Sequence, residues 1–167
     1  PDAIVHGAMQ RQRRTAEVLV TAAGWDVVPT LDAGWDEMDH LGVLDVQPRD
    51  FDGEPDGRQF QGWFEKATTR WLSGEHDADY RESWSVFRDR VLAALDRVVD
   101  GTVVVVTSGG PVSVVVAALL RSPAAYERVA PVVINASVTR VVTGSRGRTL
   151  VSFNEHGHLP GDLLTYR

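Results

Sequence analysis

Short apolar segments alternate with helical patterns in the first part of the chain. Ala3–Val5 is an apolar run typical of a strand, and apolar residues then recur at helical spacing from about residue 8 to residue 23. The expected buried face of this helix holds Ala16, Leu19, Val20 and Ala23. Gly24 is well placed to end the helix, and Asp26–Val28 is predicted to form a second short strand that Pro29 closes.

Two amphipathic helices are predicted in the middle of the chain, after an irregular stretch over 31–44 and a loop over 47–57. One face of the first helix carries Phe60, Trp63, Phe64, Ala67 and Trp71. One face of the second carries Tyr80, Trp84, Phe87, Val91, Leu95 and Val98. Aromatic residues at this spacing could stack on bases or a cofactor, but core packing is the interpretation that the periodicity favours.

A valine-rich strand and a glycine-rich turn follow. Thr102–Val106 contains four consecutive valines, which is typical of a strand buried on both faces of a parallel sheet. The turn Thr107-Ser108-Gly109-Gly110 leads into an apolar helix over Val112–Leu120, and Pro111 suits its first turn. Because ligands of open α/β sheets lie beyond the carboxyl ends of the strands, this turn is the best candidate for a binding site.

The end of the chain predicts a hairpin. Val132–Thr143 and Thr149–Asn154 have strand character, and the turn Gly144–Gly147 joins them. Strands that alternate with helices before a final hairpin predict an α/β fold with three layers, α/β/α, around a mostly parallel sheet with an antiparallel edge. The length of 167 residues suits a single domain over residues 1–167.

Composition and charge narrow the function. The net charge of −6 argues against a nucleic-acid groove, and no apolar run is long enough to span a membrane. Cysteine does not occur, which removes disulfides and thiolate chemistry. No secretory leader is recognisable, so we expect a cytoplasmic protein that binds neither nucleic acid nor membranes. The chain begins at Pro1 without a methionine, as a processed product or a piece of a longer chain would.

Two segments suit an anionic ligand. The turn at Ser108 and Gly109 precedes a helix, whose first N–H groups and partial positive charge favour an anion. Arg11 lies in the first turn of the helix after the first strand, where it can reach the same sheet edge as Ser108. Arginine binds oxyanions well because its planar guanidinium offers two parallel donors. A solvated basic face is the simpler interpretation for Arg13 and Arg14.

Five segments together resemble landmarks of the histidine phosphatase (phosphoglycerate-mutase-like) superfamily. Gly7–Ala16 is similar to its Ser-Pro-Leu-x-Arg-Ala-x-x-Thr-Ala stretch, and Val105–Leu120 is similar to its strand–Thr-His-Gly-Gly–helix, with Ser108 where the second histidine usually stands. The other three are Gly34–Gly42, which resembles Leu-x-Glu-x-x-x-Gly with one residue more than usual after Glu37, and the two late landmarks Asn135–Thr139 and Phe153–Leu159. The resemblance covers nearly the whole chain.

The resemblance implies a fold and a chemistry. In this family a histidine in an Arg-His-Gly segment on the first strand attacks phosphate, and positive charge around the phosphoryl oxygens stabilises the transfer without a metal or cofactor. By position, Arg11 corresponds to the phosphate clamp, Glu37 to the acid/base carboxylate, and Ser108 to the second histidine. The resemblance further implies that the first strand and its nucleophile lie outside this chain. It also implies that the loop and helices over 44–99 form a cap within the domain.

His6 superficially resembles that nucleophile, because an apolar strand precedes it and Gly7 follows it. Val5 stands where the family has arginine, and His6 lies only five residues before Arg11, so we interpret it as a histidine at the rim of the substrate site or as a structural histidine. His156 and His158 lie close to Glu155, but no further ligand has a suitable spacing, and no metal site is predicted.

Two functions follow from these residues. The first is hydrolysis of a small phosphomonoester through a phosphohistidine that an N-terminal segment supplies, with Gly109 and His6 beside Arg11 and Ser108 in the binding site. The second is a phospholigand-binding or protein-interaction module that has lost its chemistry, which Ser108 favours because a hydroxyl brings no positive charge. The sequence does not specify the substrate, and it leaves room for a homo-oligomer.

Overall fold

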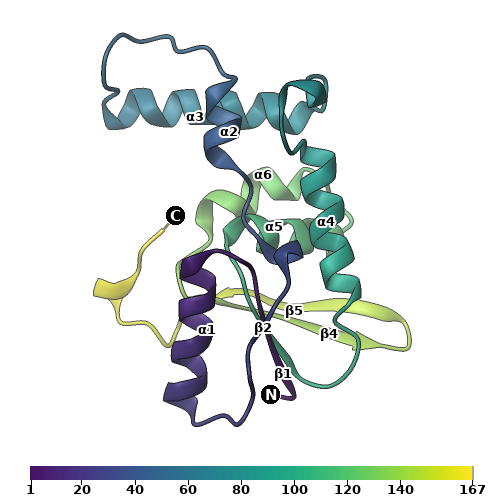
Figure 1. The fold of residues 1–167 in the computed structure, drawn as a ribbon. Helices are drawn as coiled ribbons and strands as arrows, with labels where there is room; N and C mark the ends of the chain where they lie inside the picture. Colours follow the sequence, from purple (N-terminus) through teal and green to yellow (C-terminus); the bar gives the residue numbers. More distant parts are fainter. Residues whose placement is uncertain (167) are drawn as a thin grey trace. The chain divides into compact units, whose positions relative to one another are not determined.

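The computed structural model describes residues 1–166 as a mixed α/β fold (Figure 1). The chain folds into two compact units. The larger comprises Pro1–Glu37 and Arg90–Arg167, and the smaller comprises Met38–Asp89. The smaller unit overlaps the predicted cap over 44–99, whose role stays a prediction. Within the described residues, no helix has both the length and the apolar composition required to cross a membrane.

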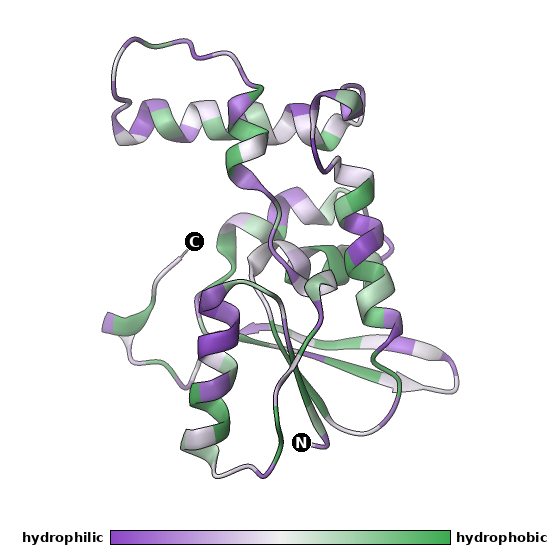
Figure 2. Ribbon diagram, in the orientation of Figure 1, coloured by the Kyte–Doolittle hydropathy of each residue, from purple (hydrophilic) through white to green (hydrophobic). Residues whose placement is uncertain are grey.

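A three-stranded parallel sheet forms the centre of the larger unit. Its order is β2-β1-β3, with β1 over Ala3–His6, β2 over Thr30–Leu31 and β3 over Val103–Val106. Helix α1 (Gln10–Ala23) packs on this sheet, and the buried residues of the contact are Ile4, Ala16 and Val106. Figure 2 shows the hydrophobic residues along β1 and β3 that make this core.

Two predictions for the first forty residues are wrong in part. Leu19 and Ala23 are exposed, so the buried face of α1 is narrower than its periodicity indicates. Residues 26–28 form no strand. The ladder with β1 begins only after Pro29, where Val5 pairs with Thr30, because proline has no N–H to donate. Val27, two residues before the proline, packs its side chain against the core.

The valine strand β3 lies at an edge of the parallel sheet. Within residues 1–166 it pairs with β1 alone, from Ala3 opposite Val103 to His6 opposite Val106. The run of valines predicts a strand that is covered on both faces. Val103, Val104 and Val105 are instead half-buried. An apolar strand with an open edge is a template for further pairing.

The C-terminal half of the larger unit contains helix α5 (Gly109–Leu119), helix α6 (Ala125–Val129) and the strands β4 (Val138–Gly144) and β5 (Gly147–Glu155). The hairpin turn is as predicted, but the pair forms a separate two-stranded sheet rather than an edge of the parallel one. The first predicted strand is also too long. Residues 130–132 form a 3-10 turn that contains Pro131, and Ala136 has a φ of 61°, so β4 starts only at Val138.

The smaller unit contains helix α2 (His40–Asp45) and helix α3 (Gly57–Ser73), and helix α4 (Trp84–Asp96) begins in it. Trp71 is fully buried, packs against Trp84 and Phe87, and donates its indole N–H to Glu82 O at 2.9 Å. The prediction of aromatic core packing is therefore confirmed for these residues.

Two aromatic positions differ from that prediction. Phe60 is 43% exposed, and Tyr80 precedes α4 instead of belonging to it. Short 3-10 turns complete the structure, and they lie at Ala33–Trp35, Asp77–Asp79, Ala130–Val132 and Gly161–Leu163.

We predict that residues 1–167 in isolation associate with one another through the open edge of β3. Light scattering after size exclusion should detect species larger than a monomer that grow with concentration. Val105→Lys should shift the population towards monomer because a charge on an edge strand opposes pairing. Val28→Lys, at an exposed position outside any strand, is the matched control. A monodisperse monomer with sharp, reversible thermal unfolding would contradict this prediction.

Candidate functional site

The carboxyl ends of β1 and β3 meet at one edge of the parallel sheet. His6 is paired with Val106, and the N–H of Gly7 donates to Val106 O at 3.3 Å. The loops that follow the two strands therefore start side by side, and each leads into the N-terminus of a helix. This is the position at which open α/β sheets bind their ligands.

Arg11 and Ser108 are in contact across this edge although 97 positions separate them. Arg11 Nη2 donates to Ser108 Oγ at 3.2 Å. The guanidinium lies in the first turn of α1 and is exposed, so its remaining N–H groups are accessible to a ligand. The structure thus brings together the two residues that the sequence singles out for an anion.

Glu37 reaches the same place from a third segment. Its side chain is 5% exposed, and Oε2 accepts the N–H of Gly110 at 3.2 Å. A carboxylate at the N-terminus of α5 is favoured by the helix dipole and by the free N–H groups of the first turn. Ser108 occupies the N-cap position but makes no side-chain cap, so its hydroxyl is left for Arg11.

The segment that carries Glu37 is held by charged and polar groups of the larger unit. Arg97 forms a forked contact with Asp32 at 2.7–3.0 Å, and Asp32 Oδ1 also accepts the N–H of Gly34. Arg90 Nη1 donates to three carbonyl oxygens, those of Ala33, Gly34 and Asp36, at 3.1–3.2 Å. These contacts fix the backbone immediately before Glu37.

His6 lies at the edge but does not point outward. It is 6% exposed, and its Nδ1 lies 2.7 Å from Gly7 O, so this nitrogen carries the proton. The two C-terminal histidines also bind carbonyl oxygens: His156 Nδ1 that of Asn154, and His158 Nε2 that of Ala136. Among the described residues, no three His, Asp or Glu side chains are grouped as metal ligands.

Gln12 is a site residue that the sequence reasoning missed. Its side chain is 2% exposed, and Nε2 donates to Ser108 Oγ at 3.0 Å and to Trp35 O at 3.1 Å. A signal for it exists in the sequence, because Gln12 stands four positions before Ala16 on the buried face of α1. A polar residue at a core position needs hydrogen-bond partners and is therefore informative.

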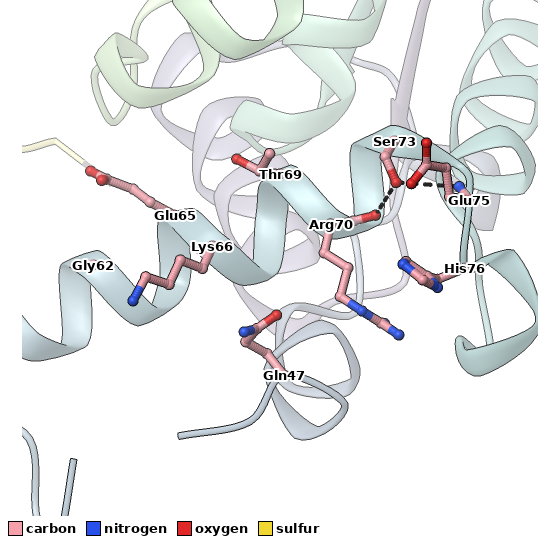
Figure 3. Close-up of a pocket in the computed structure, with 9 residues that line it drawn as sticks. All are labelled: Gln47, Gly62, Glu65, Lys66, Thr69, Arg70, Ser73, Glu75 and His76. Carbon is pink, nitrogen blue, oxygen red and sulfur yellow. Dashed lines mark hydrogen bonds between the residues drawn. The ribbon is translucent and has the colours of Figure 1, made fainter. Parts of the chain in front are cut away.

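The smaller unit has a shallow hollow of its own, of about 630 Å³, along α3 (Figure 3). Its two cations are already paired within the unit: Lys66 with Asp50, and Arg70 with Asp79 and Tyr80. The hydrogen bond from Arg70 holds the pKa of the Asp79 carboxyl below its ordinary value. A hollow with neutralised cations is a poor site for an anion, and none of the predicted site residues lines it.

Comparisons with known proteins decide the family. The model of the histidine phosphatase superfamily (branch 1) matches residues 1–156. The chain belongs to the histidine phosphatase superfamily. No curated protein sequence matches it significantly.

Solved structures support the fold of this superfamily. One is a histidine-to-alanine mutant of phosphoserine phosphatase from Entamoeba histolytica in complex with phosphoserine. It is 23% identical, with a TM-score of 0.62, and the match covers 95% of this chain and 76% of that one. The mixed α/β fold with a parallel sheet, expected from the sequence, is therefore confirmed for this histidine phosphatase domain.

We predict that Arg90→Lys destabilises the domain by about 2 kcal/mol, because the lysine side chain is one bond shorter and its ammonium does not reach the position of Arg90 Nη1, while charged hydrogen bonds contribute about 1.5–3 kcal/mol. Urea unfolding measures the loss. Arg88→Lys is the matched control, since Arg88 is exposed and pairs with the adjacent Asp89 at the surface. Equal stability of the two variants would contradict the role given to Arg90.

Proposed function

We propose that this domain hydrolyses a small phosphomonoester, with Arg11 as the phosphate clamp. The observation that carries the proposal is the contact of Arg11 with Ser108 at the sheet edge, beside the N-terminus of α5. Arginine donors and helix N–H groups that converge on one point suit a phosphoryl group, whose transfer depends on positioning and positive charge. Membership of the histidine phosphatase superfamily supports the same reaction.

The proposed nucleophile is a histidine from a segment upstream of residue 1. Neither His-Gly pair of the sequence, at residues 6 and 156, is preceded by arginine. The open edge of β3 offers a place for one more parallel strand. The carboxyl end of such a strand would lie beside the carboxyl ends of β1 and β3, so a histidine there would face Arg11.

The reaction then has two steps. The histidine nitrogen attacks phosphorus and the ester P–O bond breaks, while Glu37 in its acid form gives a proton to the leaving oxygen. Water next attacks the phosphohistidine, Glu37 as carboxylate takes its proton, and inorganic phosphate leaves. Arg11, Ser108 and the backbone at Gly109 hold the phosphoryl oxygens.

A phosphorylated small molecule is the proposed substrate class. The structural neighbour is a phosphatase that binds phosphoserine, and the chains are similar over most of their lengths. A second candidate, a module that binds a phosphorylated ligand without turning it over, is favoured by Ser108, since a hydroxyl supplies a hydrogen bond but no charge. Hydrolysis of a phosphomonoester would distinguish the phosphatase from the binding module.

Turnover of an aryl phosphate by the protein from its complete reading frame tests the clamp. We expect Arg11→Ala to lower kcat/KM by about 10²–10³-fold, as the loss of one donor to the transition state does elsewhere. Arg13→Ala is the control, because Arg13 is exposed and lies beside Glu17 on the helix surface. Equal rates for wild type and Arg11→Ala would overturn the assignment. Phosphate binding without any turnover would favour the second candidate.

Glu37→Gln tests the proton donor. We expect it to lower kcat on an alkyl phosphate such as phosphoserine by about 10²–10⁴-fold. The loss should be much smaller on nitrophenyl phosphate, whose leaving group needs little protonation. Both substrates are measured on the same sample, so any change in the folded fraction cancels in the ratio. An equal loss on both substrates would show that Glu37 acts only through the α5 N-terminus.

A further inference from the structure

Gln12 is buried at the centre of a small hydrogen-bond network beneath the candidate site. Both donor directions of its amide are used, since Nε2 donates to Trp35 O at 3.1 Å and to Ser108 Oγ at 3.0 Å. Its Oε1 accepts the N–H of Met9 at 3.3 Å, at the start of α1. The amide is thus fixed at both ends and cannot rotate without breaking these bonds.

These contacts determine what the Ser108 hydroxyl can do. A hydroxyl accepts two hydrogen bonds and donates one. Both contacts that the structure gives to Ser108 Oγ within residues 1–166 come from N–H donors, Arg11 Nη2 at 3.2 Å and Gln12 Nε2 at 3.0 Å. Neither group can accept in return. The Ser108 proton is therefore directed away from both, and Ser108 is half-buried at the edge where the ligand would lie.

Gly7 belongs to the same arrangement. A Cβ atom at Gly7 would lie 2.1 Å from Gln12 Oε1 and 2.7 Å from Asp36 Oδ1, so glycine is required by the side chain that fills this space. In the superfamily pattern quoted above, positions 7, 12 and 108 carry serine, alanine and histidine. In this chain they carry Gly7, Gln12 and Ser108, and Gln12 donates to Ser108 and occupies the space that a side chain at position 7 would need.

We propose that Gln12 is a positioning residue that makes Ser108 an oriented, uncharged hydrogen-bond donor to a phosphoryl oxygen. The inference rests on the proposed function for its ligand, but it concerns how the phosphate is held rather than whether it is turned over. The N–H groups of Gln12 and Arg11 occupy both acceptor positions of the Ser108 oxygen, and the absence of a side chain at Gly7 leaves room for the Gln12 amide. The differences from the family pattern at positions 7, 12 and 108 are then linked, because Gln12 needs both the space at Gly7 and the hydroxyl of Ser108.

Binding of inorganic phosphate to the full protein, measured by calorimetry, tests the inference in a double-mutant cycle. Gln12→Met keeps the length of the side chain and removes its donors, and Ser108→Ala removes the hydroxyl. Because one hydrogen bond contributes about 1 kcal/mol, we expect each change to weaken the Kd by about fivefold. The double variant should be no weaker than Ser108→Ala alone, since Gln12 acts only through Ser108. Gln10→Met, at an exposed position of the same helix, is the control.

Two results would overturn the inference. One is additive loss in the double variant, about 25-fold, which means that Gln12 and Ser108 act independently. The other is an unchanged Kd in Gln12→Met, which leaves Gln12 with a packing role alone. If Gln12→Met unfolds, as thermal melting will tell, Gln12→Leu replaces it in the same cycle. Failure of the proposed function has a different signature: no turnover by wild type, with phosphate binding and its coupling intact.

Discussion

The parallel pairing of β1 with β3 is the constraint on which the candidate site depends. The register places His6 opposite Val106, so the two strands end at the same level and their loops start together. Arg11 and Ser108 come from opposite halves of the sequence and meet only for this reason. A slip of one residue along this ladder would turn the core residues Ile4 and Val106 away from α1, so burial enforces the register that the site requires.

The second determinant is the N-terminus of α5, which is shared between the fold and the chemistry. Glu37 meets the Gly110 N–H, and the backbone before it is tied to Arg90 and Arg97. The stabilisation of a helix end by a carboxylate thus also places the proposed acid/base group close to Arg11, the proposed phosphate clamp. Since the carboxylate has taken over the role of the cap, Ser108 can turn its oxygen towards α1. Glu37 thus bonds the free N–H at the start of α5, and the Ser108 hydroxyl is left for the proposed ligand site.

The sequence predicts elements well where their patterns are local. The helix after the first strand, the valine strand and the final hairpin turn all follow from periodicity and turn residues. It fails where partners decide the outcome. The four valines indicate a central strand, yet burial depends on which strand lies beside β3. Arg11, Glu37 and Ser108 could be named as candidate site residues from the family pattern. For Gln12 the sequence offers only a polar side chain on the buried face of α1, and that signal does not reveal its partner Ser108, 96 positions away.

A neutral donor and an imidazole are not equivalent beside a phosphate. A histidine adds charge when protonated, and its contribution then depends on pH near its ordinary pKa of about 6.5. A serine held by an amide and a guanidinium contributes a hydrogen bond that does not titrate in this range. The positive charge for a phosphoryl group at the carboxyl ends of β1 and β3 must then come from Arg11, from the helix N–H groups and from the segment proposed to pair with β3. In the proposed reaction, the exchange at positions 7, 12 and 108 therefore leaves fewer cations to neutralise the charge of the phosphoryl group, and Arg11 is the one that contacts Ser108 directly.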